Sequence, residues 1–305
     1  MAAPQPNNYP APNPFNPVFT SSGMSVDNFY TDLAQLLPGY EERSEQIGLT
    51  RFIASNLQHQ TNGVAQAPTG TGKSLAVIAA GLTVLKNTQN TLVIATANNN
   101  LLEQYATKDL PFVQKLYPWL RWVRAKGKSN FACIDKGEEI FGQNVLFGAS
   151  PSMSNLKHWY DTTETGDKET LPEGVLGKDW GLIEADDSCT GRKCPFYYDC
   201  HYYNAKRAAK EAHIIVTNFD MVLLDLFNPM AHIMPEYQYL ILDEAHQLED
   251  KAISKLESRF TKRSVEMMIR SAERNFGIKD KELLERCMNA TESAPNTPQA
   301  PYHPE

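Results

Sequence analysis

The sequence predicts an α/β fold, in which helices cover both faces of a parallel sheet. Three short apolar runs suit the buried strands of such a sheet, at residues 92–96, 214–217 and 239–242. Stretches with helical character lie between them, for example at 73–86 and 202–212. This alternation of strands and helices is typical of a sheet that is covered on both sides.

Composition limits what the protein can contact. The 305 residues suggest about two domains, and 42% of them are hydrophobic, which suffices for a sizeable core. Acidic residues number 36 against 29 basic ones, so the net charge is −7. Proteins whose whole surface binds nucleic acid are usually basic. Any nucleic-acid contact is therefore expected to be a local strip on an acidic body.

Composition also divides the chain. Residues 1–24 and 291–305 are rich in proline and are predicted to be a disordered arm and a disordered tail. The sheet domain is expected in two parts, 25–132 and 201–250. Between them, residues 133–200 look like a polar, acidic, loop-like insertion that cannot build its own core. Residues 251–290 turn helical and charged, as at the start of a further domain.

The five cysteines point to a reducing compartment. Their odd number and uneven spacing argue against a secreted disulfide framework. We find neither a signal peptide nor an apolar run long enough to span a bilayer, so no membrane partner is expected. The sequence predicts a cytoplasmic protein, whose reduced thiols can bind metal.

A phosphate-binding loop is expected between a strand and the helix that begins near Lys73. Gly70 and Gly72 would let backbone N–H groups face a phosphate, and the helix N-terminus adds partial positive charge. Lys73 would reach the outer phosphates of ATP, and the Ser74 hydroxyl would ligate Mg²⁺. The plainer alternative is a glycine-rich turn with an exposed lysine. The loop reads Ala67, Pro68, Thr69, Gly70, Thr71, Gly72, Lys73 and Ser74, with alanine where the pattern has its first glycine.

An acidic motif, Asp243-Glu244-Ala245-His246, follows the third apolar run. A strand that ends in two carboxylates places them at the sheet edge where α/β proteins bind ligands. Asp243 would hold Mg²⁺ through its water shell, Glu244 would polarise an attacking water, and His246 would sense the γ-phosphate. Taken alone, the four residues could also be a capped helix start.

The loop and the acidic motif together resemble those of superfamily 2 helicases, and the cysteines narrow this to the DinG/XPD-like iron–sulfur helicases. Further resemblance to DinG lies at 92–96 with 102–104 and 108–111, at 125–133 and at 212–218, and in all it covers about residues 38–260. The resemblance implies a RecA-like sheet and an ATP-dependent DNA helicase with 5′→3′ polarity. Arg43 and Gln46 lie where the family has an adenine-reading motif.

The resemblance also implies what to expect beyond these motifs. Family members continue through a helical arch into a second RecA-like domain, and nothing after Asp250 resembles that domain. The chain is then expected to be a fragment, the product of a split gene, or one partner of a pair. A separate chain that supplies the second domain is one expected partner.

Four cysteines form a spaced group, Cys133, Cys189, Cys194 and Cys200, whereas Cys287 lies outside it. Four thiolates hold either a 4Fe–4S cluster or tetrahedral Zn²⁺, and spacing alone leaves both open. The family resemblance implies the iron–sulfur cluster, with a structural role.

A basic strip, Arg121, Arg124, Lys126 and Lys128, has Trp119 and Trp122 beside it. Basic and aromatic side chains together suit single-stranded DNA. The plainer alternative is a solvated helix face.

Three functions are compatible with these motifs. The first is a DNA helicase motor, and the second is a nucleotide-switched DNA-binding subunit without motor activity of its own. A small-molecule kinase is less favoured, because an Asp-Glu-Ala-His motif suits attack by water better than transfer to a bound acceptor.

Overall fold

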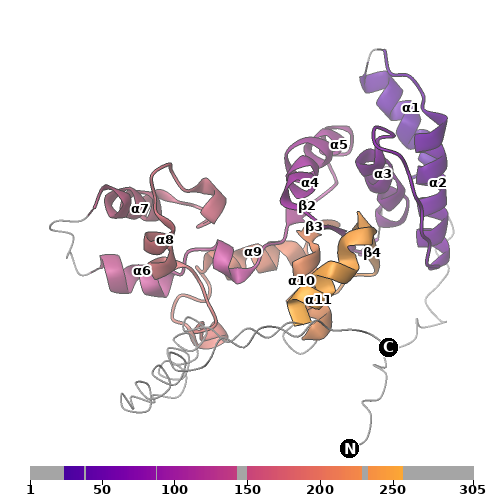
Figure 1. Cartoon of the computed structure of the whole chain (residues 1–305). Coiled ribbons are helices and arrows are strands. Elements are labelled where there is room, and N and C mark those ends of the chain that lie inside the picture. The colour runs from indigo at the N-terminus through magenta and orange to yellow at the C-terminus, as the bar shows by residue number, and fades with distance from the viewer. Residues whose placement is uncertain (1–23, 38, 87, 143–149, 229–232, 257–305) are drawn as a thin grey trace, which may run out of the picture. The chain divides into compact units, whose positions relative to one another are not determined.

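The computed structural model describes residues 24–37, 39–86, 88–142, 150–228 and 233–256 (Figure 1). The chain divides into two compact units, Met1–Gln89 and Asn90–Glu305. The expected disordered tail, most of the helical segment after Asp250, and Cys287 lie outside the described residues, as does the expected N-terminal arm except Met24, which is buried. No helix in the described part of the chain is both long and apolar enough to cross a membrane.

The first unit is helical. Its helices are α1 (Val26–Leu36), α2 (Ser44–His59) and α3 (Lys73–Leu85). Phe29 and Leu33 of α1 are fully buried in the interior of this unit. Tyr30 and Thr50 share a buried hydrogen bond of 2.7 Å between their hydroxyl oxygens, which joins α1 to α2. The third helix, α3, confirms the helix predicted at 73–86.

The strand expected before the phosphate loop is absent, and that prediction was wrong. Residues 61–68 adopt no regular secondary structure, and Val64 is 96% exposed. Val64 is the single β-branched residue between Gly63 and Pro68, and no other strand is described in this unit to pair with it. A lone extended segment has no ladder of hydrogen bonds to stabilise it.

The second unit contains a parallel sheet in the order β2-β3-β1-β4. The α/β fold class and all three predicted strands are confirmed. The fourth strand, β2, was missed because it is only three residues long and lies inside the basic strip. The strands are β1 (Leu92–Thr96), β2 (Trp122–Arg124), β3 (Ile214–Asn218) and β4 (Tyr239–Asp243).

Helices connect and cover these strands. A continuous helical segment links β1 to β2, and α10 links β3 to β4. The segment between β1 and β2 consists of α4 (Asn99–Gln104), a π-helical turn (Tyr105–Asp109) and α5 (Leu110–Leu116). The other helices outside the insertion are α9 (His201–Lys210), which confirms the helix predicted there, α10 (Phe219–Phe227) and α11 (Leu248–Leu256), with 3-10 turns at Lys128–Asn130 and Ala245–Gln247.

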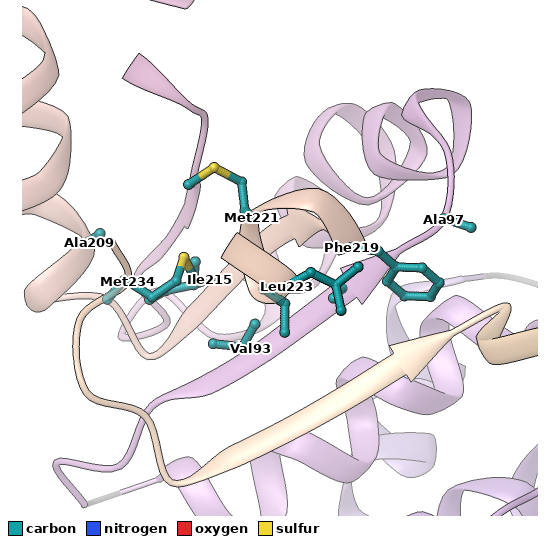
Figure 2. Close-up of a cluster of buried hydrophobic side chains, with 11 residues drawn as sticks. Val93, Ala97, Ala209, Ile215, Phe219, Met221, Leu223 and Met234 are labelled. Atoms are coloured by element: carbon teal, nitrogen blue, oxygen red, sulfur yellow. The ribbon is translucent and has the colours of Figure 1, made fainter. Parts of the chain in front are cut away.

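One face of the sheet builds the main core (Figure 2). Val93 of β1 and Ile215 of β3 are fully buried there, against Phe219 and Leu223 of α10 and Ala209 of α9. The alternate residues Leu92 and Ile94 point to the opposite face, and they too are fully buried. Burial on both faces explains why the strands read as continuous apolar runs.

The insertion is folded, so the prediction of a loop-like segment without a core was wrong. It contains α6 (Ile134–Phe141), α7 (Pro151–Thr162) and α8 (Gly177–Ile183), with short 3-10 turns at Lys168–Thr170 and Gly191–Lys193. Trp159 and Trp180 meet edge to face, with ring centroids 5.9 Å apart. The average composition of the insertion hid this core because a few large side chains supply most of it. They are Phe141, Leu156, Trp159, Trp180 and Ile183, and Ala132, just before the insertion, packs with them.

We predict that Trp180→Ala destabilises the insertion by about 3–5 kcal/mol, because Trp180 is almost fully buried in this core. Denaturant unfolding followed by tryptophan fluorescence and circular dichroism would measure the loss. Leu176→Ala is the matched control, since Leu176 is 49% exposed in the same insertion. Equal midpoints for Trp180→Ala and the unchanged protein would show that this core contributes nothing.

Candidate functional site

The phosphate loop of the first unit has the backbone geometry that its glycines predict. Gly70 and Gly72 have φ values of 85° and 79°, in the left-handed region that favours glycine. The Thr71 hydroxyl donates to the Pro68 carbonyl at 2.9 Å and closes the turn. Lys73 then begins α3, so its backbone lies at the positive end of the helix. Ser74, in the first turn of α3, is buried to 9% exposure.

The two residues expected to read adenine contact the loop itself. Arg43 Nη1 donates to the Gly70 carbonyl and Gln46 Nε2 donates to the Gly72 carbonyl, each at 3.0 Å. Gln46 is buried in α2, so this contact fixes the loop against a rigid helix. Both side chains therefore support the loop, and contact with adenine stays a prediction.

In the second unit, the acidic motif lies at the carboxyl edge of the sheet. Asp243 is the last residue of β4 and is in register with Thr96, the last residue of β1. Asn218 ends β3 at the same level and caps α10. Parallel strands thus bring several polar groups to the edge where α/β proteins bind ligands, as the sequence predicted.

Glu244 holds an unusual backbone conformation. Its φ is 60° and its ψ is 42°, and Gln60 is the one other non-glycine residue with positive φ in the described chain. This conformation costs a residue with a Cβ on the order of 1 kcal/mol, and such strain gathers at functional sites. His246 is 70% exposed at its side chain, and its Nδ1 lies 3.5 Å from Glu244 Oε2.

The Asp243 carboxylate has a buried partner that sequence reasoning missed. The Tyr105 hydroxyl donates to Asp243 Oδ2 at 3.0 Å, from the first residue of the π-helical turn. Burial, and then the negative charge of Asp243, raise the pKa of Tyr105 well above its ordinary value. The hydroxyl therefore keeps its proton and acts as a donor. No local pattern in the sequence indicated this contact, because Tyr105 and Asp243 are 138 positions apart in the chain.

A cavity of about 390 Å³ opens beyond these strand ends. Its walls come from α4 and from the residues that follow Asp243, so the acidic motif faces an accessible space. The lining residues are Asn98, Asn100, Leu101, Gln104, Glu244, His246 and Gln247.

The four spaced cysteines lie close together. Cys133 precedes α6, Cys200 precedes α9, and Cys189 and Cys194 flank the 3-10 turn Gly191–Lys193. Three of them, Cys133, Cys189 and Cys194, line one small cavity of about 10 Å³. Cys189 and Cys200 are near enough to Cys194 that their charge, as thiolates, contributes to raising its pKa. All four are free thiols.

The surroundings of these thiols partly fit a metal centre. Burial raises the pKa of Cys133 and of Cys194, while a backbone N–H, from Lys136 and Phe196 respectively, donates to each sulfur and opposes the rise. Such N–H donors are characteristic of iron–sulfur thiolates. Within the described residues, however, no three His, Cys, Asp or Glu side chains are arranged to hold a metal ion. The residue types therefore fit a cluster, and the arrangement does not by itself establish one.

The basic strip is less open than the sequence predicted. Arg124 and Lys126 have side chains only 14% and 10% exposed, and both form ion pairs with Glu169 of the insertion, at 2.9 and 2.7 Å. Arg124 also pairs with Glu103 of α4 at 2.8 Å, and Lys126 with Asp167 at 2.5 Å. These charges join the insertion to the sheet.

The ends of the strip are more accessible. Lys128 pairs with Asp187 at 3.0 Å and its side chain is 32% exposed. Arg121 is exposed, and its Nε donates to the Glu211 carbonyl at 2.7 Å. Contact of any of the four residues with DNA stays a prediction, and the geometry favours Arg121 and Lys128 for it.

Comparisons with known proteins found two family models and a solved structure that match parts of the chain. The family model DEAD_2 matches residues 189–265, and the model for the type III restriction enzyme res subunit matches residues 39–162. Among solved structures, an XPD helicase covers 82% of this chain and 40% of its own, at 17% identity and a TM-score of 0.44.

Two curated bacterial relatives are similar to most of this chain. The ATP-dependent DNA helicase YoaA of Haemophilus influenzae is 30% identical over 231 residues, which cover 72% of this chain and 35% of the relative. The 3′-5′ exonuclease DinG of Bacillus subtilis is 30% identical over 234 residues, which cover 75% of this chain and 25% of the relative. The chain thus spans about a third or less of the length of either. On the phosphate loop, the acidic motif and these relatives, the chain is homologous to part of the DinG/YoaA proteins.

Proposed function

We propose that this chain is the nucleotide-binding part of an ATP-dependent DNA helicase. The observation that carries the proposal is the carboxylate pair at the end of β4. Asp243 is buried and hydrogen-bonded there, and Glu244 is held in a left-handed backbone conformation beside it. The relatives supply the reaction class, because YoaA is named an ATP-dependent DNA helicase.

Each residue then has a defined task. The backbone of the loop, Lys73 and the N-terminus of α3 bind the phosphates of ATP. The Ser74 hydroxyl and the Asp243 carboxylate, through water, hold the Mg²⁺ that neutralises charge on the phosphates. Glu244 accepts a proton from the attacking water, and His246, beside it, is placed to respond to the loss of the γ-phosphate. The 5′→3′ polarity, which the family resemblance implies, and the cytoplasmic location, which the sequence predicts, both stay predictions.

The alternative is a nucleotide-switched DNA-binding subunit, which would bind ATP without turnover. A switch of that kind needs the loop and the magnesium ligand but has no need for a general base. The strained conformation of Glu244 therefore favours hydrolysis.

We predict that Glu244→Gln lowers ATP hydrolysis by about 10²–10⁴-fold, because the water loses its base, while ATP binding persists. Lys73→Ala should instead abolish binding. Phosphate release with single-stranded DNA present, and binding of a fluorescent ATP analogue, would separate the two effects. Glu249→Gln, a change in α11 close along the chain, is the control. A normal rate in Glu244→Gln would favour the switch.

We propose further that Cys133, Cys189, Cys194 and Cys200 hold a 4Fe–4S cluster. Its support is the closeness of the four thiols, the backbone N–H donors to two of them, and the family resemblance. Bound iron would stabilise the thiolates that burial otherwise disfavours. The cluster would fix the cysteine segment of the insertion beside α9, whereas the aromatic core holds α6, α7 and α8 together without it.

We predict a brown protein with about four irons per chain and broad absorbance near ~400 nm after anaerobic purification. Replacing any one of the four cysteines by serine should remove iron, and Cys287→Ser should not. Because the insertion has its own core, circular dichroism should show α6–α8 retained after cluster loss. A colourless protein with one tightly bound zinc would contradict the iron–sulfur assignment and leave the ATP site unaffected.

We also propose single-stranded DNA as the nucleic-acid partner, bound at the accessible ends of the strip. Replacing Arg121 and Lys128 by glutamine should lower the slope of log affinity against log salt by about 0.7 for each phosphate that is no longer neutralised. The same change at Arg124 or Lys126 should reduce stability more than the slope, because their charges are engaged with Glu169. Fluorescence anisotropy at several salt concentrations would measure the slopes. An unchanged slope in the double variant would show that the strip does not bind DNA.

A further inference from the structure

Tyr105 occupies a special place in the helical segment that follows β1. The segment runs from Asn99 to Leu116 and changes from α to π geometry at Tyr105. A π-helical turn adds one residue to the turn, which shifts the side chains that follow it, and such turns are rare and concentrate at functional sites. This turn begins at the residue whose hydroxyl reaches Asp243.

The hydroxyl is not needed to fill space. Tyr105 is fully buried, and a phenylalanine ring of nearly the same volume would occupy the same position without bringing a polar group into the core. A buried phenol is tolerated only with a partner, and here the Asp243 carboxylate accepts its hydrogen bond at 3.0 Å. The pair therefore joins the π-helical turn to the carboxyl end of β4.

The hydrogen bond restricts the carboxylate. Asp243 is 9% exposed, so it has few alternative partners in solvent. With Oδ2 accepting from Tyr105, rotation about the Cβ–Cγ bond is limited, and the second oxygen is left to accept from the water shell of an ion. Partners of this kind are known to orient carboxylates that bind metal ions.

We propose that Tyr105 is a positioning residue that orients the Asp243 carboxylate for Mg²⁺·ATP. The proposal rests on the proposed function, because it takes Asp243 as the residue that holds the hydrated ion. Tyr105 touches neither nucleotide nor metal in this role. Tyr105 instead fixes the rotamer of Asp243, which holds the ion, and the π-helical turn positions the Tyr105 hydroxyl for this contact.

Tyr105→Phe tests the proposal, because it removes one oxygen and keeps the ring. Binding of a fluorescent ATP analogue to the full chain would be titrated with Mg²⁺ to obtain the half-saturating concentration of the ion. We expect this concentration to rise by about 10-fold, the lower end for loss of a group that supports a metal ligand. Nucleotide binding without Mg²⁺ should be unchanged.

Tyr30→Phe is the matched control. Tyr30 is also a buried tyrosine, and its hydroxyl shares a hydrogen bond with Thr50 in the first unit. Both variants lose one buried hydrogen bond and should lower the melting temperature to a similar extent. Only Tyr105→Phe should raise the half-saturating Mg²⁺ concentration, which is the Mg²⁺ midpoint of the titration. Equal midpoints in Tyr105→Phe and the unchanged protein, or an equal shift in Tyr30→Phe, would overturn the proposal.

Asp243→Asn separates this inference from the function on which it rests. If Asp243→Asn shifts the Mg²⁺ midpoint and Tyr105→Phe does not, Tyr105 has no positioning role and the proposed function stands. If Asp243→Asn leaves the half-saturating Mg²⁺ concentration unchanged, Asp243 is not the residue that holds the ion. Both the positioning role of Tyr105 and the magnesium role of Asp243 in the proposed function are then overturned.

Discussion

The parallel pairing of β1 with β4 is the constraint on which the second unit depends. It sets Asp243 level with Thr96, and it requires the chain after each strand to cross back over the sheet. The crossover after β1 is the helical segment that carries Tyr105, so one connection both links β1 to β2 and supplies the partner of Asp243. A slip of one residue in this register would turn Asp243 to the other face of the sheet and separate it from Tyr105.

The insertion is joined to the sheet by charge, whereas its own interior is apolar. Glu169 accepts from both Arg124, at the end of β2, and Lys126. Arg124 also contacts Glu103 of α4, which lies two residues before Tyr105. A short chain of ion pairs thus connects the cysteine-containing insertion with the helical segment beside the acidic motif. Partly buried pairs of this kind are costly to break, because each leaves a charge without its partner.

Local patterns predicted the parts of the fold that local sequence determines. The apolar runs of β1, β3 and β4 and the glycines of the phosphate loop each carry their own signal, and each was found. Tertiary features were missed. Arg124 and Lys126 look like a solvated basic strip until Glu169, distant in sequence, is folded against them. The core of the insertion depends on a few large side chains in a polar segment, and Tyr105 becomes significant only when the π-helical turn brings it to Asp243.

The proposed function requires the phosphate loop and Asp243 to act on the same Mg²⁺·ATP. A crystal structure of the chain with Mg²⁺ and a non-hydrolysable ATP analogue would test it most directly. We expect the β- and γ-phosphates at Lys73 and the N-terminus of α3. A water of the magnesium ion should be hydrogen-bonded to the Asp243 carboxylate, while the Tyr105 hydroxyl still donates to Asp243 Oδ2. A nucleotide bound at the loop with its magnesium ion remote from Asp243 would contradict it.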